Sequence, residues 1–441
     1  MKINNNHIYR KHDDTYYVIS ANGGGFKLMN KTACFIFEEI LKADTLEQAK
    51  GSFLAAVPGE SRGAAGSDFD AIAKLCDEKY GIFLNSRPAT AGKSAEADIL
   101  QELYKKAGAP SRITKCHVEL TDNCNFRCRM CYMGPEIQKK AHRALKPAEF
   151  RKIVDLLEKD GLIELTLTGG EPLLNPDIAE LLGMLREKNF FSAINTNGSV
   201  LNETILKALR EVRVCSMEVS VYGFSEEVYE RVTGRKEFAK VLENVNKFVA
   251  AGLPVRLKYT LQNENMRDVR AFKAYCLEKG LDHSVTRGEL MPDITGAQTS
   301  GRALSDEETE EMVLAGIVNL PDPKERCDSS GCKLAKSRLT IDSHGNAFPC
   351  EIVRLNLGNI LGENAWEVVG DRNKRLALVA GIPVDPSPEC AACKTKTYCS
   401  HRTCPAARYA VQGRVGGRYE PACKQAGLFQ RIWVKKNENA E

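Results

Sequence analysis

The stretch Cys124-Asn-Phe-Arg-Cys128-Arg-Met-Cys131 sets three cysteines on one short segment, just after the run His117-Val-Glu-Leu-Thr121. Three thiolates this close can bind three irons of a 4Fe–4S cluster and leave the fourth iron without a protein ligand. That open iron can accept a cofactor. A structural zinc site requires four ligands, so three cysteines alone fit zinc poorly. The stretch predicts an iron–sulfur cluster with one open iron, against the alternative of buried thiols.

The composition predicts a soluble globular protein. The 441 residues are 43% hydrophobic and 27% charged, with a net charge of +4, and two or three domains are expected for this length. The chain has neither a basic nor an acidic tail, so its charge distribution does not indicate binding to nucleic acid or to a membrane. The chain has no apolar run of about 18 residues, and Met1-Lys-Ile-Asn-Asn-Asn lacks the apolar core of a signal peptide. A cytoplasmic location is therefore expected.

The 16 cysteines are unevenly distributed, with eight of them between Cys327 and Cys423. A reducing cytosol disfavours disulfides, so closely spaced cysteines indicate metal binding. Five others lie among apolar neighbours, and most of them are expected to be packed core thiols: Cys34, Cys76, Cys116, Cys215 and Cys276.

Residues 1–88 are predicted to form a winged-helix-like α+β module. Thr15-Tyr-Tyr-Val-Ile-Ser20 and residues 26–29 favour strands, and Asn30 is placed to cap a helix. Two further amphipathic segments follow near 46–57 and 69–80. The simplest role for such a module is packing or dimerisation. Residues 89–110 are expected to be a linker with a short helix at 99–107.

Residues 111–315 alternate between predicted strands and helices. The expected strands are 115–120, 162–167, 190–195, 215–221, 254–260 and 282–287, and the expected helices are 147–159, 177–188, 202–210, 225–250 (broken at Gly234) and 266–279. Six βα repeats predict a partial parallel barrel whose chemistry lies at the C-terminal ends of the strands. The three-cysteine loop follows the first strand and belongs to that end.

The second predicted strand ends in Leu165-Thr-Leu-Thr-Gly169-Gly170-Glu171-Pro172. Two glycines let a ligand approach the backbone closely, and a glutamate can accept a hydrogen bond from an ammonium group. Alone, this motif is also typical of a turn before a helix. Combined with the three-cysteine loop in a βα frame, it resembles the radical S-adenosylmethionine (radical SAM) superfamily.

This resemblance implies that the open iron chelates the amino and carboxylate groups of S-adenosylmethionine. Gly169, Gly170 and Glu171 match the motif that contacts the amino group, and Thr196 matches a further cofactor contact. Ser220 and Arg231 match a pair that meets the ribose and the carboxylate. The family usually places an aromatic residue before the third cysteine, where this chain has Met130, followed after Cys131 by Tyr132.

Residues 316–441 resemble the SPASM extension of radical enzymes, which helps to hold two auxiliary 4Fe–4S clusters. The resemblance implies two interleaved ligand sets: Cys327, Cys332, Cys350 and Cys404 for one cluster, and Cys390, Cys393, Cys399 and Cys423 for the other. Four residues separate Cys399 from Cys404, where the family commonly has three. A zinc ribbon built on Cys390/Cys393 and Cys399/Cys404 is the alternative.

The N-terminal module resembles the peptide-recognition domains of ribosomal-peptide maturases, in which a leader peptide adds a strand to a sheet edge. Winged helices also bind DNA, but Glu38 and Glu39 interrupt the first helix, so a peptide is the favoured partner over nucleic acid. Glu351 follows Cys350 as an aspartate base does in anaerobic sulfatase maturases, which makes it a candidate catalytic base. A solvated or salt-bridged glutamate is the alternative.

The sequence therefore predicts a radical SAM maturase of a ribosomal precursor peptide, with S-adenosylmethionine and three 4Fe–4S clusters as cofactors. By resemblance, a 5′-deoxyadenosyl radical abstracts a hydrogen from the peptide, which then closes a thioether or carbon–carbon crosslink. A cytosolic electron donor such as flavodoxin or ferredoxin is expected. The alternatives are a peptide epimerase, a maturase of a folded protein side chain and, outside enzymes, an iron–sulfur or zinc winged-helix regulator.

Overall fold

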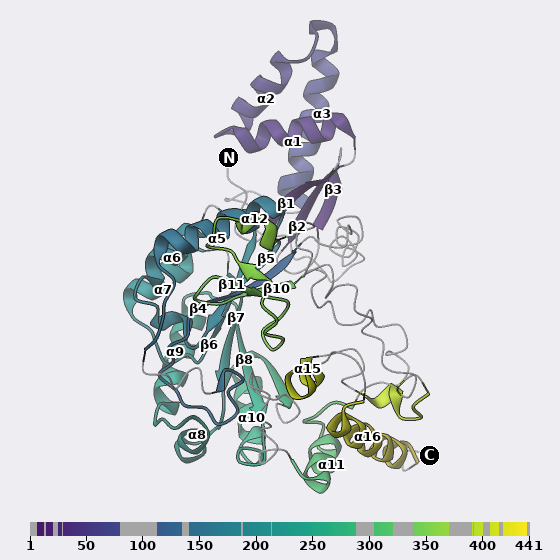
Figure 1. The fold of residues 1–441 in the computed structure, drawn as a ribbon. Coiled ribbons are helices and arrows are strands. Elements are labelled where there is room, and N and C mark those ends of the chain that lie inside the picture. The colour runs from purple at the N-terminus through teal and green to yellow at the C-terminus, as the bar shows by residue number, and fades with distance from the viewer. Residues whose placement is uncertain are drawn as a thin grey trace.

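One sheet of nine strands organises the computed structural model of the protein (Figure 1). The model describes residues 7–12, 15–20, 25–28, 30–79, 113–134, 141–186, 188–212, 214–287, 304–320, 338–369, 390, 392–399, 406–413 and 418–438. The strand order is β12-β11-β10-β4-β5-β6-β7-β8-β9. The strands from β4 to β9 are parallel and adjacent in chain order, which confirms the predicted α/β fold with a partial parallel barrel.

The six barrel strands match the predicted ones to within two residues at each end. They are β4 (Lys115–Thr121), β5 (Glu164–Gly169), β6 (Phe191–Thr196), β7 (Val214–Val221), β8 (Val255–Leu261) and β9 (Asp282–Arg287). The helices that follow them are α5 (Pro147–Asp160), α6 (Ile178–Met184), α7 (Glu203–Glu211), α8 (Glu226–Thr233), α9 (Phe238–Ala250) and α10 (Val269–Glu278). Gly234 ends α8 in a left-handed conformation, where the sequence predicted the break.

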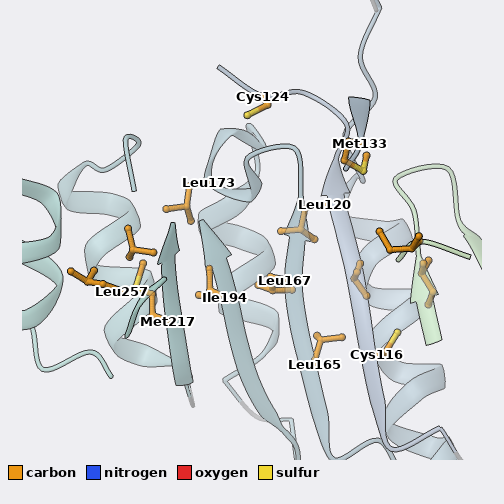
Figure 2. Packing of buried hydrophobic residues seen from close by; sticks show 14 of the residues in the cluster. Cys116, Leu120, Cys124, Met133, Leu165, Leu167, Leu173, Ile194, Met217 and Leu257 are labelled. Atoms are coloured by element: carbon orange, nitrogen blue, oxygen red, sulfur yellow. The ribbon is translucent and has the colours of Figure 1, made fainter. Parts of the chain in front are cut away.

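The two faces of the barrel sheet differ in polarity. Along β8, Val255, Leu257, Tyr259 and Leu261 are buried toward the helices, whereas Arg256, Lys258 and Thr260 alternate with them on the other face. Apolar side chains of the neighbouring strands complete this helix-covered core, including Leu165, Leu167, Ile194 and Met217 (Figure 2). The inner face carries charged and hydroxyl groups, so the barrel interior is polar rather than filled by apolar side chains as in a closed barrel.

Three C-terminal strands extend the sheet beyond β4. Strand β10 (Arg338–Ile341) pairs in parallel with β4, and β11 (Asn346–Phe348) and β12 (Gly358–Asn359) follow in antiparallel order. These strands were not predicted, because segments of two to four residues carry no usable periodicity. They place the segment after Cys350 beside the first barrel strand.

The N-terminal module consists of an antiparallel sheet followed by three helices. Its elements are β1 (His7–His12), β2 (Thr15–Ser20), β3 (Gly25–Leu28), α1 (Lys31–Lys42), α2 (Leu46–Ala55) and α3 (Arg62–Lys74), the last continuing into a π-helical turn at Leu75–Lys79. Asn30 caps α1 as predicted, by accepting from the Ala33 amide at 2.6 Å. Strand β1 was not predicted, and α3 begins seven residues earlier than expected. The predicted linker 89–110 and its short helix lie outside the described residues, so that boundary stays a prediction.

The N-terminal sheet packs against the N-terminal ends of the barrel strands. Ile8, Tyr17 and Ile19 form a buried cluster with Ile163, which precedes β5, and Phe191, which begins β6. A side-chain amide reinforces this contact. The Tyr9 amide donates to Asn189 Oδ1 at 3.2 Å, and Asn189 Nδ2 donates back to the Tyr9 carbonyl at 2.9 Å. The module therefore lies at the opposite end of the barrel from the three-cysteine loop.

The rest of the C-terminal region is helical where it is described. Helix α11 (Asp306–Leu314) begins with a capping box, in which Ser305 accepts from the Glu308 amide at 3.1 Å. Three further helices are α12 (Ala365–Val368), α15 (Ala406–Gln412) and α16 (Glu420–Glu438), and a 3-10 turn spans Lys396–Tyr398. Arg431 of α16 pairs with Asp306 of α11 at 3.1 Å. Every helix within the described ranges is too short or too polar to span a lipid bilayer.

Candidate functional site

A cavity of about 400 Å³ opens at the C-terminal ends of the barrel strands. Nine residues predicted from sequence line it: Cys124, Cys128, Met130, Cys131, Gly169, Gly170, Thr196, Ser220 and Glu351. They come from loops and strands that are far apart in the chain, and the parallel topology brings their ends to one edge of the sheet. The barrel thus assembles most of the predicted site in one place.

The cysteine loop is tied to the end of helix α8 by its backbone. The Arg127 amide donates to the Thr233 carbonyl at 2.8 Å, and the Arg129 amide donates to the Val232 carbonyl at 3.1 Å. Cys124 is buried, and its burial raises the pKa of the thiol to about 12. Burial alone therefore favours the protonated thiol, whereas a bound iron would remove that proton.

Gly169 and Gly170 are required by the chain itself. A Cβ on Gly170 would lie 2.1 Å from the Asn123 carbonyl oxygen, and one on Gly169 would lie 2.3 Å from the Thr121 carbonyl oxygen. Gly169 also has a φ of 125°, which disfavours any other residue. The two glycines were predicted to let a ligand approach the backbone closely. The structure adds a steric reason, because the backbone that leads into the cysteine loop passes directly over them.

Glu171 is fully buried and is not part of the cavity wall. Its carboxylate accepts hydrogen bonds from the Thr196 hydroxyl at 2.7 Å, the Asn197 amide at 2.7 Å and the Leu173 amide at 3.0 Å. Burial raises the pKa of Glu171 to about 7, against the lowering effect of these donors. Glu171 therefore positions the end of β6 beside the cysteine loop. Its predicted contact with a cofactor amino group stays a prediction.

Arg231 lies away from the cavity. Its side chain is on the exposed part of α8, where the guanidinium pairs with Glu227 at 2.7 Å. Ser220, its predicted partner, ends β7 inside the cavity. The structure thus separates two residues that the sequence analysis assigned to one ligand. By contrast, Met130 and Tyr132 both line the cavity, on either side of Cys131.

Several residues that line the cavity were not identified from sequence. Glu218 and Lys258 face each other on β7 and β8, with the Lys258 ammonium 3.5 Å from Glu218 Oε2. Asn195 and Asn197 line the cavity at the end of β6, and Asn197 Nδ2 lies 3.9 Å from Cys124 Sγ. The alternation of apolar and polar residues along β8 could have identified Lys258 as facing a polar interior, since a strand buried on both faces is apolar throughout.

Glu351 lies at the cavity wall beside His117. The distance from Glu351 Oε2 to His117 Nδ1 is 3.8 Å, and Arg338 lies 4.0 Å from Glu351 Oε1. Burial lowers the pKa of His117, which favours the neutral imidazole. Glu351 thus faces the cavity and also has charged neighbours, and its role as a base stays a prediction.

Comparison with known families matches residues 118–276 to the model of the radical SAM superfamily. The matched segment begins in β4, includes the three-cysteine loop and the Gly169-Gly170 turn, and ends in α10. This chain contains a radical SAM domain. The family implies S-adenosylmethionine and an iron–sulfur cluster as its cofactors, and the cavity that joins three cysteines to the glycine turn suits both.

Relatives of the radical SAM domain include enzymes named as nucleotide cyclases and as a peptide cyclase. A probable GTP 3′,8-cyclase of Thermococcus kodakarensis is 32% identical over 159 residues, which cover 36% of this chain and 50% of the relative. Against such GTP 3′,8-cyclases the chain spans about half of the relative's length. The PqqA peptide cyclase of Gluconobacter oxydans is 28% identical over 348 residues, which cover 73% of this chain and 94% of the relative.

A solved structure shares the fold over nearly the whole chain. SuiB of Streptococcus suis, determined with its precursor peptide SuiA, superposes with a TM-score of 0.61. The match covers 96% of this chain and 99% of SuiB at 14% sequence identity. At this identity the likeness concerns the fold alone.

A second cavity, outside the radical SAM domain, is lined by four cysteines: Cys390, Cys393, Cys399 and Cys423. These are the members of one predicted auxiliary ligand set. A contact of 3.3 Å joins Cys393 Sγ to the Thr395 hydroxyl, and this hydrogen bond lowers the pKa of the Cys393 thiol. In the described ranges, no three His, Cys, Asp or Glu side chains are close enough to share one metal ion. Each thiolate of a 4Fe–4S cluster binds its own iron, so the four cysteines of such a cluster need not lie that close together.

The other predicted auxiliary set is described only at Cys350. Its thiol accepts a hydrogen bond from the Val353 amide at 3.3 Å. Cys327, Cys332 and Cys404 lie outside the described residues, so the partition of the eight cysteines between two clusters stays a prediction.

Proposed function

We propose that this protein is a radical SAM maturase that installs a crosslink in a ribosomally made precursor peptide. The observation that carries the proposal is the joint architecture. A polar cavity with three cysteines occupies one end of the barrel, and a sheet-and-helix module is docked at the other end. The alignment to a peptide cyclase over nearly its whole length supports a peptide as the substrate.

The N-terminal module has one sheet edge better suited to peptide addition. The outer backbone groups of Tyr9 on edge strand β1 are bonded to the Asn189 side chain. A leader peptide would therefore extend the sheet at β3, through main-chain hydrogen bonds. The module and the cysteine loop lie at opposite ends of β4, whose seven residues span about 23 Å. A peptide bound at β3 must therefore run along the barrel to reach the cavity.

In the cavity, the chain's own residues would bind the cluster, orient the peptide and shield the reaction from water. Cys124, Cys128 and Cys131 would hold the cluster, with the loop backbone fixed by α8. When bound, the reduced cluster and S-adenosylmethionine supply a 5′-deoxyadenosyl radical that removes one hydrogen atom from the peptide. The second hydrogen would leave the peptide as a proton, which Glu351 would accept, and an auxiliary cluster, when bound, would supply the acceptor for the remaining electron. The inward-facing polar side chains of β7 and β8 would hold the peptide groups near this position.

The test is anaerobic turnover of reconstituted enzyme with S-adenosylmethionine, dithionite and the short peptide encoded beside it. We expect 5′-deoxyadenosine and a peptide lighter by two hydrogens, with neither formed by the Cys124→Ala variant. A peptide mass that is unchanged after turnover in H2O, together with uptake of one deuterium after turnover in D2O, would indicate a peptide epimerase instead. Absence of 5′-deoxyadenosine together with tight DNA binding would favour a winged-helix regulator.

Leader recognition requires a test that keeps the fold intact. Deleting residues 1–88 would expose Ile163 and Phe191, which pack beneath the module. Amide hydrogen exchange of the full chain avoids this problem. We expect the precursor peptide to protect β3 without protecting β1, and a peptide without its leader to protect neither. The proposal also includes a cytoplasmic location and a flavodoxin or ferredoxin as electron donor.

A further inference from the structure

Arg408 is a buried cation in the wall of the second cavity, the one lined by four cysteines. It lies on α15 and is only 3% exposed, although an arginine side chain usually reaches water. Lys396 lines the same cavity. Among the residues that the structure describes in this wall, none is an aspartate or a glutamate. The described wall therefore has two cations and no carboxylate.

The cavity at the end of the barrel has the opposite charge balance. Its described wall contains two carboxylates, Glu218 and Glu351, and a single lysine or arginine, Lys258. His117 adds little positive charge, because burial lowers its pKa and favours the neutral imidazole. The two sets of cysteines thus lie in different electrostatic surroundings, and those of the C-terminal set are the more positive.

Charge around an iron–sulfur cluster changes its reduction potential. A guanidinium stays protonated in proteins, and its charge is costly to bury unless negative charge lies nearby. Thiolates that bind iron supply negative charge, and a cluster held by four of them is itself negative. Reduction adds one more negative charge, so a buried cation in the wall stabilises the reduced cluster more than the oxidised one.

We propose that Arg408 raises the reduction potential of the C-terminal cluster, meaning the 4Fe–4S cluster that the four cysteines of the second cavity would hold. This inference rests on the proposed function, because it requires an iron–sulfur cluster at these cysteines. It deepens that function by naming the auxiliary cluster that is suited to accept the electron from the peptide. Arg408 acts through the cluster, by its charge.

The test is a redox titration of full-length, cluster-loaded protein without oxygen, followed by electron paramagnetic resonance. All samples carry Cys124→Ala, Cys128→Ala and Cys131→Ala, which remove the cluster of the barrel. Cys423→Ala identifies the signal of the C-terminal cluster by its loss. At a fixed solution potential, Arg408→Met should lower the ratio of reduced to oxidised C-terminal cluster by about tenfold. For a one-electron couple this equals a potential lower by about 59 mV.

Arg408→Lys should change that ratio by less than about threefold, because it keeps the positive charge. Arg431→Met is the matched control, since Arg431 is an exposed arginine of α16 outside the second cavity, and it should change the ratio by less than about twofold. Iron content, measured for every variant, shows whether the clusters are intact. Should Arg408→Met lose iron, Arg408→Gln provides the same comparison with a polar, neutral side chain.

An unchanged ratio in the neutral Arg408 variants would overturn the inference, and so would an equal fall in Arg408→Lys, because positive charge would then not be the cause. Loss of the C-terminal cluster from both neutral variants would also overturn it, by showing that Arg408 is needed to hold the cavity together. These outcomes leave the proposed function in place, since peptide turnover by the wild type is measured separately. Wild-type protein without iron at the C-terminal cysteines would instead overturn the auxiliary cluster of the proposed function.

Discussion

Arg354 donates two hydrogen bonds to the carboxylate of Glu119, across the seam between the barrel and its C-terminal strands. Glu119 is 2% exposed near the end of β4, and the Arg354 guanidinium lies 5.0 Å from the centre of the Phe348 ring. The same guanidinium lies 3.6 Å from Met133 Sδ, two residues after the last cysteine of the loop. This ion pair therefore connects the first barrel strand, the cysteine loop and the segment that follows Cys350.

Replacing only one residue of this ion pair should destabilise the protein strongly. In Arg354→Met the buried Glu119 loses its counter-charge, which should lower the free energy of unfolding by about 3–5 kcal/mol. Replacing both residues, as Glu119→Met/Arg354→Met, should recover most of that loss, because no buried charge remains. Urea denaturation measures the free energy of unfolding of the single and the double variant. Arg270→Met, which removes an exposed pair with Glu311, should cost less than about 1 kcal/mol. Equal losses in the single and double variants would contradict this explanation.

Gly170 should not tolerate a side chain. An alanine Cβ would meet the Asn123 carbonyl, so Gly170→Ala should displace the cysteine loop and destabilise the protein by about 1–3 kcal/mol or more. Iron content and thermal unfolding report on the two effects. Gly183→Ala is the control, since Gly183 lies within α6 with nothing near its Cβ position, and alanine there should stabilise the helix by up to about 1 kcal/mol. A Gly170→Ala protein with full iron content would disprove the steric argument.

Removing one cysteine of the second cavity should remove one cluster. Alanine in place of Cys390, Cys393, Cys399 or Cys423 should each lower the iron content by about four per chain, because all four line one cavity. The Cys276→Ala variant should keep its iron, as Cys276 is a buried thiol of α10. Zinc in place of iron, lost in the Cys390, Cys393 and Cys399 variants but kept in Cys423→Ala, would support the zinc ribbon.

Glu171 should make stability depend on pH. Burial raises its pKa in the folded protein to about 7 from 4.5, so folding favours the protonated carboxyl. The stabilisation is fully present below about pH 4.5 and is lost as the pH rises through about 7. Relative to Glu171→Gln, the wild type should therefore lose about 3 kcal/mol over this range.

Urea midpoints measured at a series of pH values under reducing conditions check the Glu171 prediction. The exposed Glu203→Gln variant should follow the wild-type curve. A wild-type curve parallel to that of Glu171→Gln would show that the hydrogen bonds from Thr196 and Asn197 keep the carboxylate ionised.

Local signals in the sequence were sufficient for the barrel. The alternation of strand and helix segments along the chain predicted the barrel, and Asn30 and Gly234 marked helix ends through conformations that depend on neighbouring residues alone. Short or weakly patterned elements, such as β1 and β10 to β12, were missed because long-range pairing rather than local propensity stabilises them.

The sequence by itself determined which residues are candidates for the chemistry: the three cysteines, the glycine turn and the cysteines near the C-terminus. Their types and spacings are properties of the chain and need no knowledge of its path. Tertiary structure decided which of them meet. It turned Arg231 outward and Lys258 inward, buried Glu171 beneath the loop, and joined Arg354 to Glu119 across 235 positions of chain. The physical reason is that side-chain direction and burial depend on packing between distant segments, which no local pattern records.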